Sequence, residues 1–464
     1  MQNQNLENKK IDLTSGSITR NIFYLAGPVV ATMFLETAFS LANIFWVGKL
    51  GAVSLAAVIS STILVWIIYS LVGTISVGVT ALVSRSIGAK DLEQASSVAR
   101  QAYLFAILVA LSLSVLGIFF SRSAFVLMGT EQEVTHLGSR YLRIIFSGAV
   151  FFFMIDLFGA TFRATGDTKT PMLVTLGSVG LNMILDPFLI FGWGPFPRLE
   201  TSGAAIASVI SQGLGSCLLG YLIIRGGGPD SAIRGRLGFK FSLLPKFNLD
   251  FAVIWRILRI GIPASIAWIT FSVVYLFLNK IVALFGTEAI AALGIGNRME
   301  SISFLTCSGF SIATSTMVGQ NLGAGKPERS ARTAWRAAGI VVLITALVSI
   351  MFFVFPRQII SFFISDPQVD RIGTGYLQIL ALSQMFMALE IVFEGAFAGA
   401  GNTIPPMAVS IPGSVARIPL AYLMAVHWGM GINGVWWAIT LTTIVKGIVS
   451  TYWFSRGKWK TKKI

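Results

Sequence analysis

The chain contains VSRSIGAKDLEQAS at residues 83–96 and VGQNLGAGKPERSA at residues 318–331. The first residues of these two stretches are 235 positions apart, and the same offset aligns TFRATGDTKTP at residues 161–171 with AFAGAGNTIPP at residues 396–406. Self-similarity at so long an offset indicates a duplicated domain rather than a short repeat. We therefore expect two halves with the same fold.

The composition indicates that both halves lie in a membrane. Hydrophobic residues make up 55% of the chain, charged residues make up 12%, and the mean hydropathy is +0.77. A membrane-spanning helix needs about 20 mostly apolar residues, and hydropathy predicts about twelve such runs, six in each half. An even number of spans per half makes the halves parallel repeats around a central cavity. The predicted fold class is an all-α integral membrane protein with about 12 transmembrane helices in two six-helix lobes.

The distribution of the 35 Lys and Arg residues predicts the orientation in the membrane. They gather in alternate segments between the apolar runs, so the positive-inside rule places both termini in the cytoplasm. The net charge of +15 then reflects topology and attraction to anionic lipids, and it indicates no nucleic-acid partner. The predicted segments are a cytoplasmic amino-terminal segment (1–20), an N-lobe (21–225), a cytoplasmic linker (226–250), a C-lobe (251–455) and a basic cytoplasmic tail (456–464).

The sequence contains no motif that indicates an enzyme. No GxxxxGK[ST] loop is present to cradle the phosphates of a nucleotide. The apolar runs contain no nucleophile–base pair and no cluster of metal ligands. Cys217 and Cys307 are isolated in apolar segments, and this fits reduced core residues. We therefore expect neither an enzyme nor a chain that hydrolyses ATP, and we expect no cofactor.

Taken together, the repeated motifs resemble the multidrug and toxic compound extrusion (MATE) family. The resemblance depends on the paired loops IGAKDLEQA and LGAGKPERSA, on FRATGDTKTP with FAGAGNTIPP, and on NMILDPFLIFGWG at residues 182–194. It is strongest to the DinF-like prokaryotic branch. It implies a multidrug exporter in the inner membrane that antiports amphiphilic, often cationic compounds against H⁺ or Na⁺ by alternating access. The expected partners are small organic substrates, the coupling ion and membrane lipids, and the expected state is a monomer.

Asp186 is the foremost carboxylate within the apolar runs. A carboxylate in hydrocarbon costs roughly 2.5 to 3.5 kcal/mol on insertion scales, so each one is a functional hypothesis. Asn182 lies four residues earlier on the same helical face, and Pro187 frees a backbone carbonyl of the preceding turn. Such oxygens can cradle a hard cation such as Na⁺. The resemblance assigns Asn182 and Asp186 to the cation site of the amino-terminal lobe, with the Ser208 hydroxyl beside them; the alternative is a polar pair that ties helices together.

The first apolar run departs from the family pattern. MATE proteins usually carry an Asp in a VDTxxVG context, whereas this chain has ANIFWVG, so Asn43 takes the position of the carboxylate. Glu36 lies seven residues earlier, two turns away on the same face. We expect Glu36 to serve ion coupling or substrate binding. The alternative is a structural ion pair or a hydrogen bond to a neighbouring helix.

Two further carboxylates, Glu390 and Glu394, lie one helical turn apart in the second half. They would repel each other if both were ionised. One is therefore protonated, or they pair with Lys280, Arg298 or Arg417. Either an internal ion-pair network or a contact with the cationic substrate would explain them.

The second half also lacks the residues expected of a cation site. The NorM-type branch of the family has a Glu on its seventh span, where this chain has Phe271. At the repeat offset, Arg417 aligns with Asn182. We therefore expect a single cation site, in the first lobe.

These residues suggest a mechanism. A carboxyl group in a low-dielectric environment can hold a proton and release it when the lobe opens to solvent, and Na⁺ competes only for the ionised form. We expect ion occupancy to bend the first helix at Pro28, because prolines kink helices, although Pro is also common near a helix start. The bend would reshape a cavity lined by Phe39, Trp66, Tyr69 and Phe158, unless these aromatic residues face lipid.

A flippase for a lipid-linked sugar or another lipid is the alternative function. A flippase that handles pyrophosphate should present several cationic side chains to its cavity. At membrane depth the sequence suggests only Lys280, Arg298 and Arg417. This scarcity favours antiport.

Overall fold

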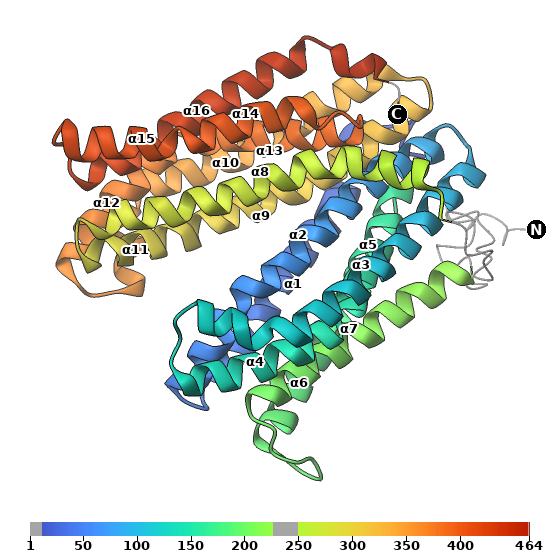
Figure 1. Ribbon diagram of the computed structural model, residues 1–464. Coiled ribbons are helices and arrows are strands. Elements are labelled where there is room, and N and C mark those ends of the chain that lie inside the picture. Colours follow the sequence, from blue (N-terminus) through green and yellow to red (C-terminus); the bar gives the residue numbers. More distant parts are fainter. Residues whose placement is uncertain (1–11, 226–248, 463) are drawn as a thin grey trace, which may run out of the picture. The chain divides into compact units, whose positions relative to one another are not determined.

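The computed structural model describes residues 12–225, 249–462 and 464, and every regular element within these ranges is a helix (Figure 1). Ten helices are long and apolar enough to cross a membrane, and the number rises to twelve when each of two bent helix pairs counts as one span. This confirms the predicted fold class. Parts of the predicted amino-terminal segment (1–11), linker (226–248) and tail (Lys463) lie outside the described residues.

The described residues of the first half form seven helices. The fourth and fifth helices are one apolar span bent by 50°. The helices are α1 (Ile18–Gly48), α2 (Ala52–Gly88), α3 (Leu92–Leu127), α4 (Gln132–Ser147), α5 (Ala149–Thr165), α6 (Lys169–Phe191) and α7 (Thr201–Ile224).

The second half repeats this order with more interruptions. Its α12 and α13 again form one span, bent by 53°. The elements are α8 (Phe251–Ala283), α9 (Thr287–Gly323), α10 (Pro327–Val354), α11 (Pro356–Phe363), α12 (Pro367–Ala381), α13 (Gln384–Gly399), α14 (Ile404–Val415), α15 (Arg417–Tyr422), the π-helix η1 (Leu423–His427), α16 (Ile432–Ser455) and the 3₁₀-helix η2 (Lys458–Thr461).

Prolines lie near two places where the second half breaks a helix that stays continuous in the first, although α6 continues through Pro187 and α14 through Pro412. A proline cannot donate the helical hydrogen bond and its ring clashes with the preceding turn. The counterpart of α3 therefore ends at Val354, and Pro356 starts the separate helix α11. The counterpart of α6 contains Pro412 and Pro419 and is divided into α14, α15 and η1.

The chain divides into two compact units whose boundaries pass through α1 and α8. Unit one holds Gly27–Gly261, and unit two holds Thr14–Ala26 together with Ile262–Ile464. The first nine residues of α1 therefore group with unit two, and the first eleven of α8 with unit one. Pro28 and Pro263 follow these two boundaries directly.

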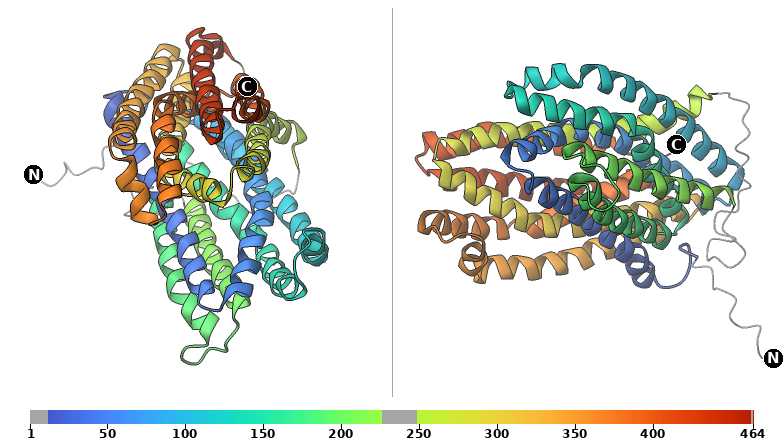
Figure 2. Two further views of the ribbon diagram at one scale, coloured as in Figure 1. Left: turned by 90° about the vertical axis from the view of Figure 1, so that its left-hand side faces the viewer. Right: turned by 90° about the horizontal axis from the view of Figure 1, so that it is seen from below.

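Within each unit the helices run side by side as a bundle (Figure 2). In unit one, α2 packs on α5, and α6 packs on α7. Gly203 of α7 lies directly against the backbone of Leu189 in α6, where a side chain would collide. In unit two, α13 packs on α9, with Gly395 and Gly399 against the α9 backbone. Small residues that bring helix backbones close are typical of packing in membranes.

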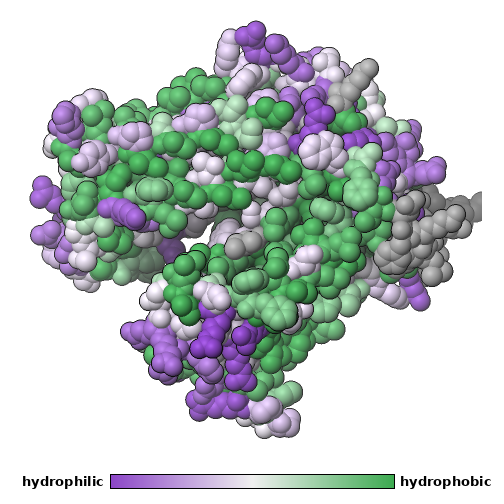
Figure 3. Space-filling model, in the orientation of Figure 1, coloured by the Kyte–Doolittle hydropathy of each residue, from purple (hydrophilic) through white to green (hydrophobic). Residues whose placement is uncertain are grey.

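The surface is suited to lipid. Hydrophobic residues cover the middle of the helices, and hydrophilic residues gather at their ends (Figure 3). Large apolar side chains such as Phe119, Leu347 and Phe362 are mostly exposed. Exposed apolar surface on this scale marks contact with a membrane or a partner.

Candidate functional site

The structure brings together four polar residues that the sequence predicts as a cation site in unit one. Asn182 and Asp186 lie on α6, Ser208 lies on α7 and Asn43 lies near the end of α1. All four are buried, and Asn182 and Asp186 have no exposed surface. The four-residue spacing on α6 aims both of its side chains at α7, which packs alongside.

Hydrogen bonds join these residues into a cluster. The Asn43 amide nitrogen donates to the Ser208 hydroxyl at 3.2 Å. With its amide in the orientation that satisfies both neighbours, Asn182 donates to Asp186 Oδ2 at 3.2 Å and accepts from the Ser208 backbone N–H at 3.2 Å. Such amide orientations are assigned from the hydrogen-bond network.

Two buried oxygens of this cluster, Asn43 Oδ1 and Asp186 Oδ1, have no hydrogen-bond partner. Unpaired buried acceptors are costly, so each needs an explanation. A third oxygen, the backbone carbonyl of Met183, is close in sequence. It lacks its helical hydrogen bond because Pro187 has no N–H to donate. Acceptor oxygens around one carboxylate fit a proton or a small hard cation.

Tyr141 of α4 also belongs to this region, and we did not predict it. Its buried side chain is close enough to Asp186 for the two to interact electrostatically. Its position within a segment that contains two arginines suggested an outer loop rather than a site. The signal that could have found it is the repeat, because Tyr376 stands 235 residues later in a buried position of unit two.

Glu36 lies near a second polar cluster of unit one. The charged groups near enough to act on it are Asp156 and Arg163 of α5. Asp156 accepts from the Ser76 hydroxyl, and Arg163 donates to Asp156 Oδ1 at 3.4 Å. Asp156 is thus a candidate site residue that we did not select. Its two-turn spacing from Arg163 on one helix was the available signal.

The other predicted residues of unit one are a proline and four aromatic residues. Pro28 lies inside α1 and not at its start. Phe39 and Phe158 are partly buried, and the Phe158 ring contacts Tyr103 with centroids 4.9 Å apart. Trp66 and Tyr69 are largely exposed and contact each other edge to face.

In unit two, Glu390 forms an ion pair with Lys446 of α16 at 2.8 Å. The expected partners Lys280, Arg298 and Arg417 were therefore wrong for Glu390. Lys446 is almost fully buried, and Glu394 also lies within its electrostatic reach. An ion pair at this depth supports the structural interpretation of Glu390.

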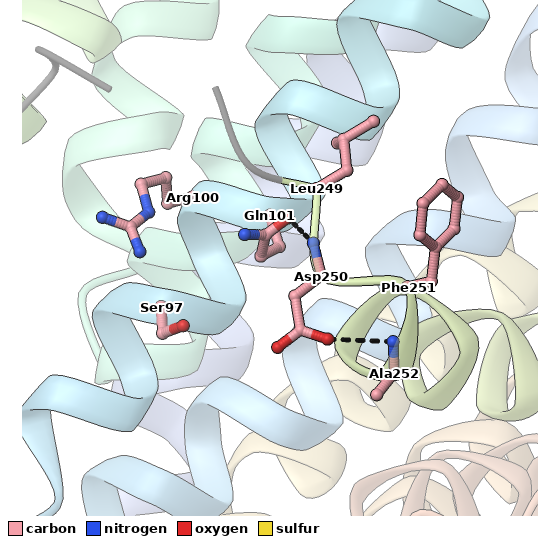
Figure 4. A pocket seen from close by; sticks show the side chains of 7 residues that line it. All are labelled: Ser97, Arg100, Gln101, Leu249, Asp250, Phe251 and Ala252. Atoms are coloured by element: carbon pink, nitrogen blue, oxygen red, sulfur yellow. Dashed lines mark hydrogen bonds between the residues drawn. The ribbon is translucent and has the colours of Figure 1, made fainter. Parts of the chain in front are cut away.

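A cavity of about 570 Å³ lies elsewhere in unit one, where the first turns of α3 meet the start of α8. Gln101 accepts from the Asp250 backbone N–H at 3.0 Å, and Asp250 caps α8 through the N–H of Ala252 (Figure 4). None of the predicted site residues lines this cavity. Its hydrogen bonds fix the beginning of α8, so we assign it a structural role.

Comparison with known sequences identifies the family. The MatE family profile matches residues 28–188 and again residues 263–423, and the two matches are separated by the repeat offset. The chain belongs to the MatE family. The matched ranges begin at Pro28 and Pro263 and cover most of both units.

Individual relatives of this MatE protein are similar over nearly their full lengths. A probable multidrug resistance protein NorM from Thermotoga maritima is 30% identical, covering 96% of this chain and 94% of the relative. An FAD transporter from Shewanella oneidensis is 29% identical, covering 95% of each. A crystal structure of a MATE protein in the straight conformation matches with a TM-score of 0.88 and 25% identity, covering 98% of this chain and 99% of that one. Family and relatives are membrane transporters, and the relatives' names support multidrug efflux.

Among the residues that the structure describes, no group of three or more His, Cys, Asp and Glu side chains could hold a metal ion. The cluster around Asp186 differs from such a group because amide and hydroxyl oxygens accompany a single carboxylate.

Proposed function

We propose that this MatE protein is a secondary active exporter of amphiphilic organic cations, which it antiports against H⁺ or Na⁺ by alternating access. The observation that carries this proposal is the buried carboxylate of Asp186, one oxygen of which has no partner inside a membrane-spanning helix. A carboxylate so placed is costly, and carboxylates within membrane spans typically mark ion pathways or proton relays.

The ion would bind among the side chains that already converge on Asp186. Asn182 orients the carboxylate by donating to one oxygen, which leaves the other oxygen and Asn43 Oδ1 for the ion. Ser208 links the two asparagines through its backbone and hydroxyl. A proton would neutralise Asp186, and Na⁺ would draw on the same acceptors.

Coupling to a conformational change would pass through α1. Asn43 connects this helix to α7, so an ion at Asp186 acts directly on α1. Pro28 lies farther along the same helix, directly after the boundary between the units. We assign Pro28 the role of a bending point whose geometry depends on ion occupancy.

The organic cation would meet the acidic residues that are not fully buried. Glu36 and Asp156 form such a pair in unit one, with Arg163 nearby to limit their combined negative charge. Phe39, Trp66, Tyr69 and Phe158 of the same unit offer aromatic faces, which attract organic cations. In unit two, Glu394 is the matching candidate, because Lys446 is already bonded to Glu390.

The protein would act in the inner membrane of a prokaryote, with both termini in the cytoplasm, surrounded by lipid and without a cofactor. The positive-inside distribution of Lys and Arg supports this orientation. The proposed lobes comprise residues 21–225 and 251–455, and the monomeric state stays a prediction.

A lipid flippase, or an exporter of an anionic dinucleotide as the name of the FAD transporter suggests, would need free cationic side chains. In the part of unit two that the structure describes, the two deeply buried cations are both engaged, whereas Lys280 and Arg298 are exposed. Lys446 is paired with Glu390, and Arg417 donates to Thr442 and Thr443. This engagement favours a cationic substrate.

The decisive experiment is efflux of a fluorescent organic cation from proteoliposomes under separately imposed H⁺ and Na⁺ gradients. The native chain should respond to one gradient, and Asp186→Asn should lose that response, because an amide cannot exchange the ion. Asp370→Asn is the matched control, since it makes the same replacement on α12 of unit two, away from the cation cluster, where the acid pairs with the exposed Arg357. Efflux that survives Asp186→Asn would contradict the proposal, and FAD transport without cation transport would favour an anionic substrate.

A further inference from the structure

At the repeat offset, the residues of the cation cluster in unit one align in sequence with a defined set of residues in unit two. Asn182 of α6 corresponds to Arg417, and Ser208 of α7 corresponds to Thr443. In unit one these positions are bonded through the Asn182 amide and the Ser208 N–H at 3.2 Å. In unit two, Arg417 donates to the Thr443 hydroxyl at 2.8 Å. The same two positions therefore touch in both units.

The surroundings of Arg417 are those of a bound cation. Its side chain is almost fully buried and also donates to the Thr442 hydroxyl at 2.9 Å. The ring of Phe271 lies 5.7 Å from the guanidinium carbon, and Tyr275 and Glu300 act on the guanidinium from α8 and α9. Hydroxyl acceptors, an aromatic face and a nearby acid are together the recognition elements for an organic cation.

The two units differ in what remains unpaired. The cluster of unit one leaves Asn43 Oδ1 and Asp186 Oδ1 without donors. The counterparts of Asn43 and Asp186 in unit two are Leu278 and Ala421, which have no polar side-chain atoms. Unit two thus has no carboxylate at the position of Asp186 and carries a covalently attached positive charge at the position of Asn182.

We propose that unit two retains a site for a monovalent cation at the position equivalent to the Asp186 site, and that the guanidinium group of Arg417 occupies it permanently as a tethered ligand. The site takes a guanidinium-sized cation. This site then stays in one charge state throughout the cycle. With the antiport proposed above, this leaves a single exchangeable ion per cycle, in unit one.

Removing the tether tests the site without any transport assay. Arg417→Ala should lower the midpoint temperature of unfolding of the purified protein. Millimolar guanidinium chloride should restore it in a saturable way, because a ligand that binds only the folded state stabilises it. The same concentration of NaCl serves as the ionic-strength control, and the native chain should not respond to guanidinium.

Two further variants keep the test decisive. Arg417→Ala with Thr443→Val should lose the response to guanidinium, because an acceptor is gone. Arg417→Asn, which copies Asn182 of unit one and keeps Thr443, should respond to guanidinium as Arg417→Ala does. Equal effects of NaCl and guanidinium, or a response that persists without Thr443, would overturn the proposal.

If Arg417→Ala does not fold, the native chain with Thr442→Val and Thr443→Val replaces it. The proposal requires this variant to unfold at a lower temperature than the native chain, and an unchanged midpoint would refute it. All these measurements concern binding and stability. A failure of the proposed antiport would instead appear as efflux that is independent of Asp186, so the two failures are distinguishable.

Discussion

Unit one and unit two share their helix order but use their buried polar residues in opposite ways. Unit one gathers neutral amides and a hydroxyl around one carboxylate and leaves two oxygens unpaired. Unit two binds its buried cations firmly, with Lys446 on Glu390 and Arg417 on two threonines. Unit one therefore keeps buried acceptor oxygens available, whereas the buried cations of unit two are held in place.

The largest expected effect concerns the ion pair of unit two. Lys446→Met should lower the free energy of unfolding by about 3 to 5 kcal/mol, because it leaves Glu390 buried without its partner. Glu390→Gln should cost a similar amount, and the double variant should recover much of the loss. Denaturant unfolding in detergent measures all three. If the single variants matched the native stability, the contrast between the units would fail.

The prolines at the unit boundaries come next. Pro28→Ala restores a hydrogen-bond donor inside α1, so it should straighten the helix and slow transport about ten-fold, equivalent to about 1.4 kcal/mol. Pro263→Ala in α8 is the matched variant. We expect it to slow transport less, since we place coupling in unit one. Efflux rates from proteoliposomes show which of the two variants is slower. Equal rates would mean that both helices bend at these prolines.

The equivalent tyrosines give a smaller effect. The Tyr376 hydroxyl donates to Asn297 Oδ1 at 3.1 Å, so Tyr376→Phe should cost about 1 kcal/mol of stability and leave ion coupling unchanged. Tyr141→Phe should change the dependence of efflux on the ion gradient, because Tyr141 lies beside Asp186. Thermal unfolding together with gradient-driven efflux separates the two roles. A coupling defect in Tyr376→Phe would argue for an active ion site in unit two.

The smallest effect concerns helix starts that differ between the units. Asp91 caps α3 by accepting from the Gln94 N–H at 2.9 Å, whereas its counterpart Lys326 precedes Pro327 and caps nothing with its side chain. Asp91→Ala should cost about 1 kcal/mol, and Asp91→Asn should retain most of the cap. Unfolding midpoints measure both. A cost as large for Asn as for Ala would show that charge rather than the hydrogen bond matters.

Much of the fold could be predicted from the sequence because a repeat and hydropathy act over long stretches. The 235-residue offset relates α2 to α9 at both ends, and the apolar runs match the helices long enough to span a membrane. The 50° and 53° bends were not predicted. Hydropathy reports which residues avoid water and contains no information on helix direction.

The site was predictable only where its residues lie close together in the chain or match a family motif. Asn182 and Asp186 are one turn apart, so helical geometry alone put them on one face. The pairing of Glu390 with Lys446 joins helices that are distant in sequence, and charge alone could not select Lys446 from the other cations in or at the ends of the apolar runs. Asp156 was among the carboxylates of the apolar runs but was not selected as a site residue, because its neighbours Ser76 and Glu36 come from other helices.

The opening turns of α1 and α8 group with a different unit from the rest of each helix. Each unit therefore contains the first turns of a helix whose remainder belongs to the other unit. A polypeptide that ended at residue 225 would lack the first turns of α8 that group with unit one. A polypeptide that began at residue 251 would lack the first turns of α1 that group with unit two, so neither half of the sequence repeat contains a complete unit.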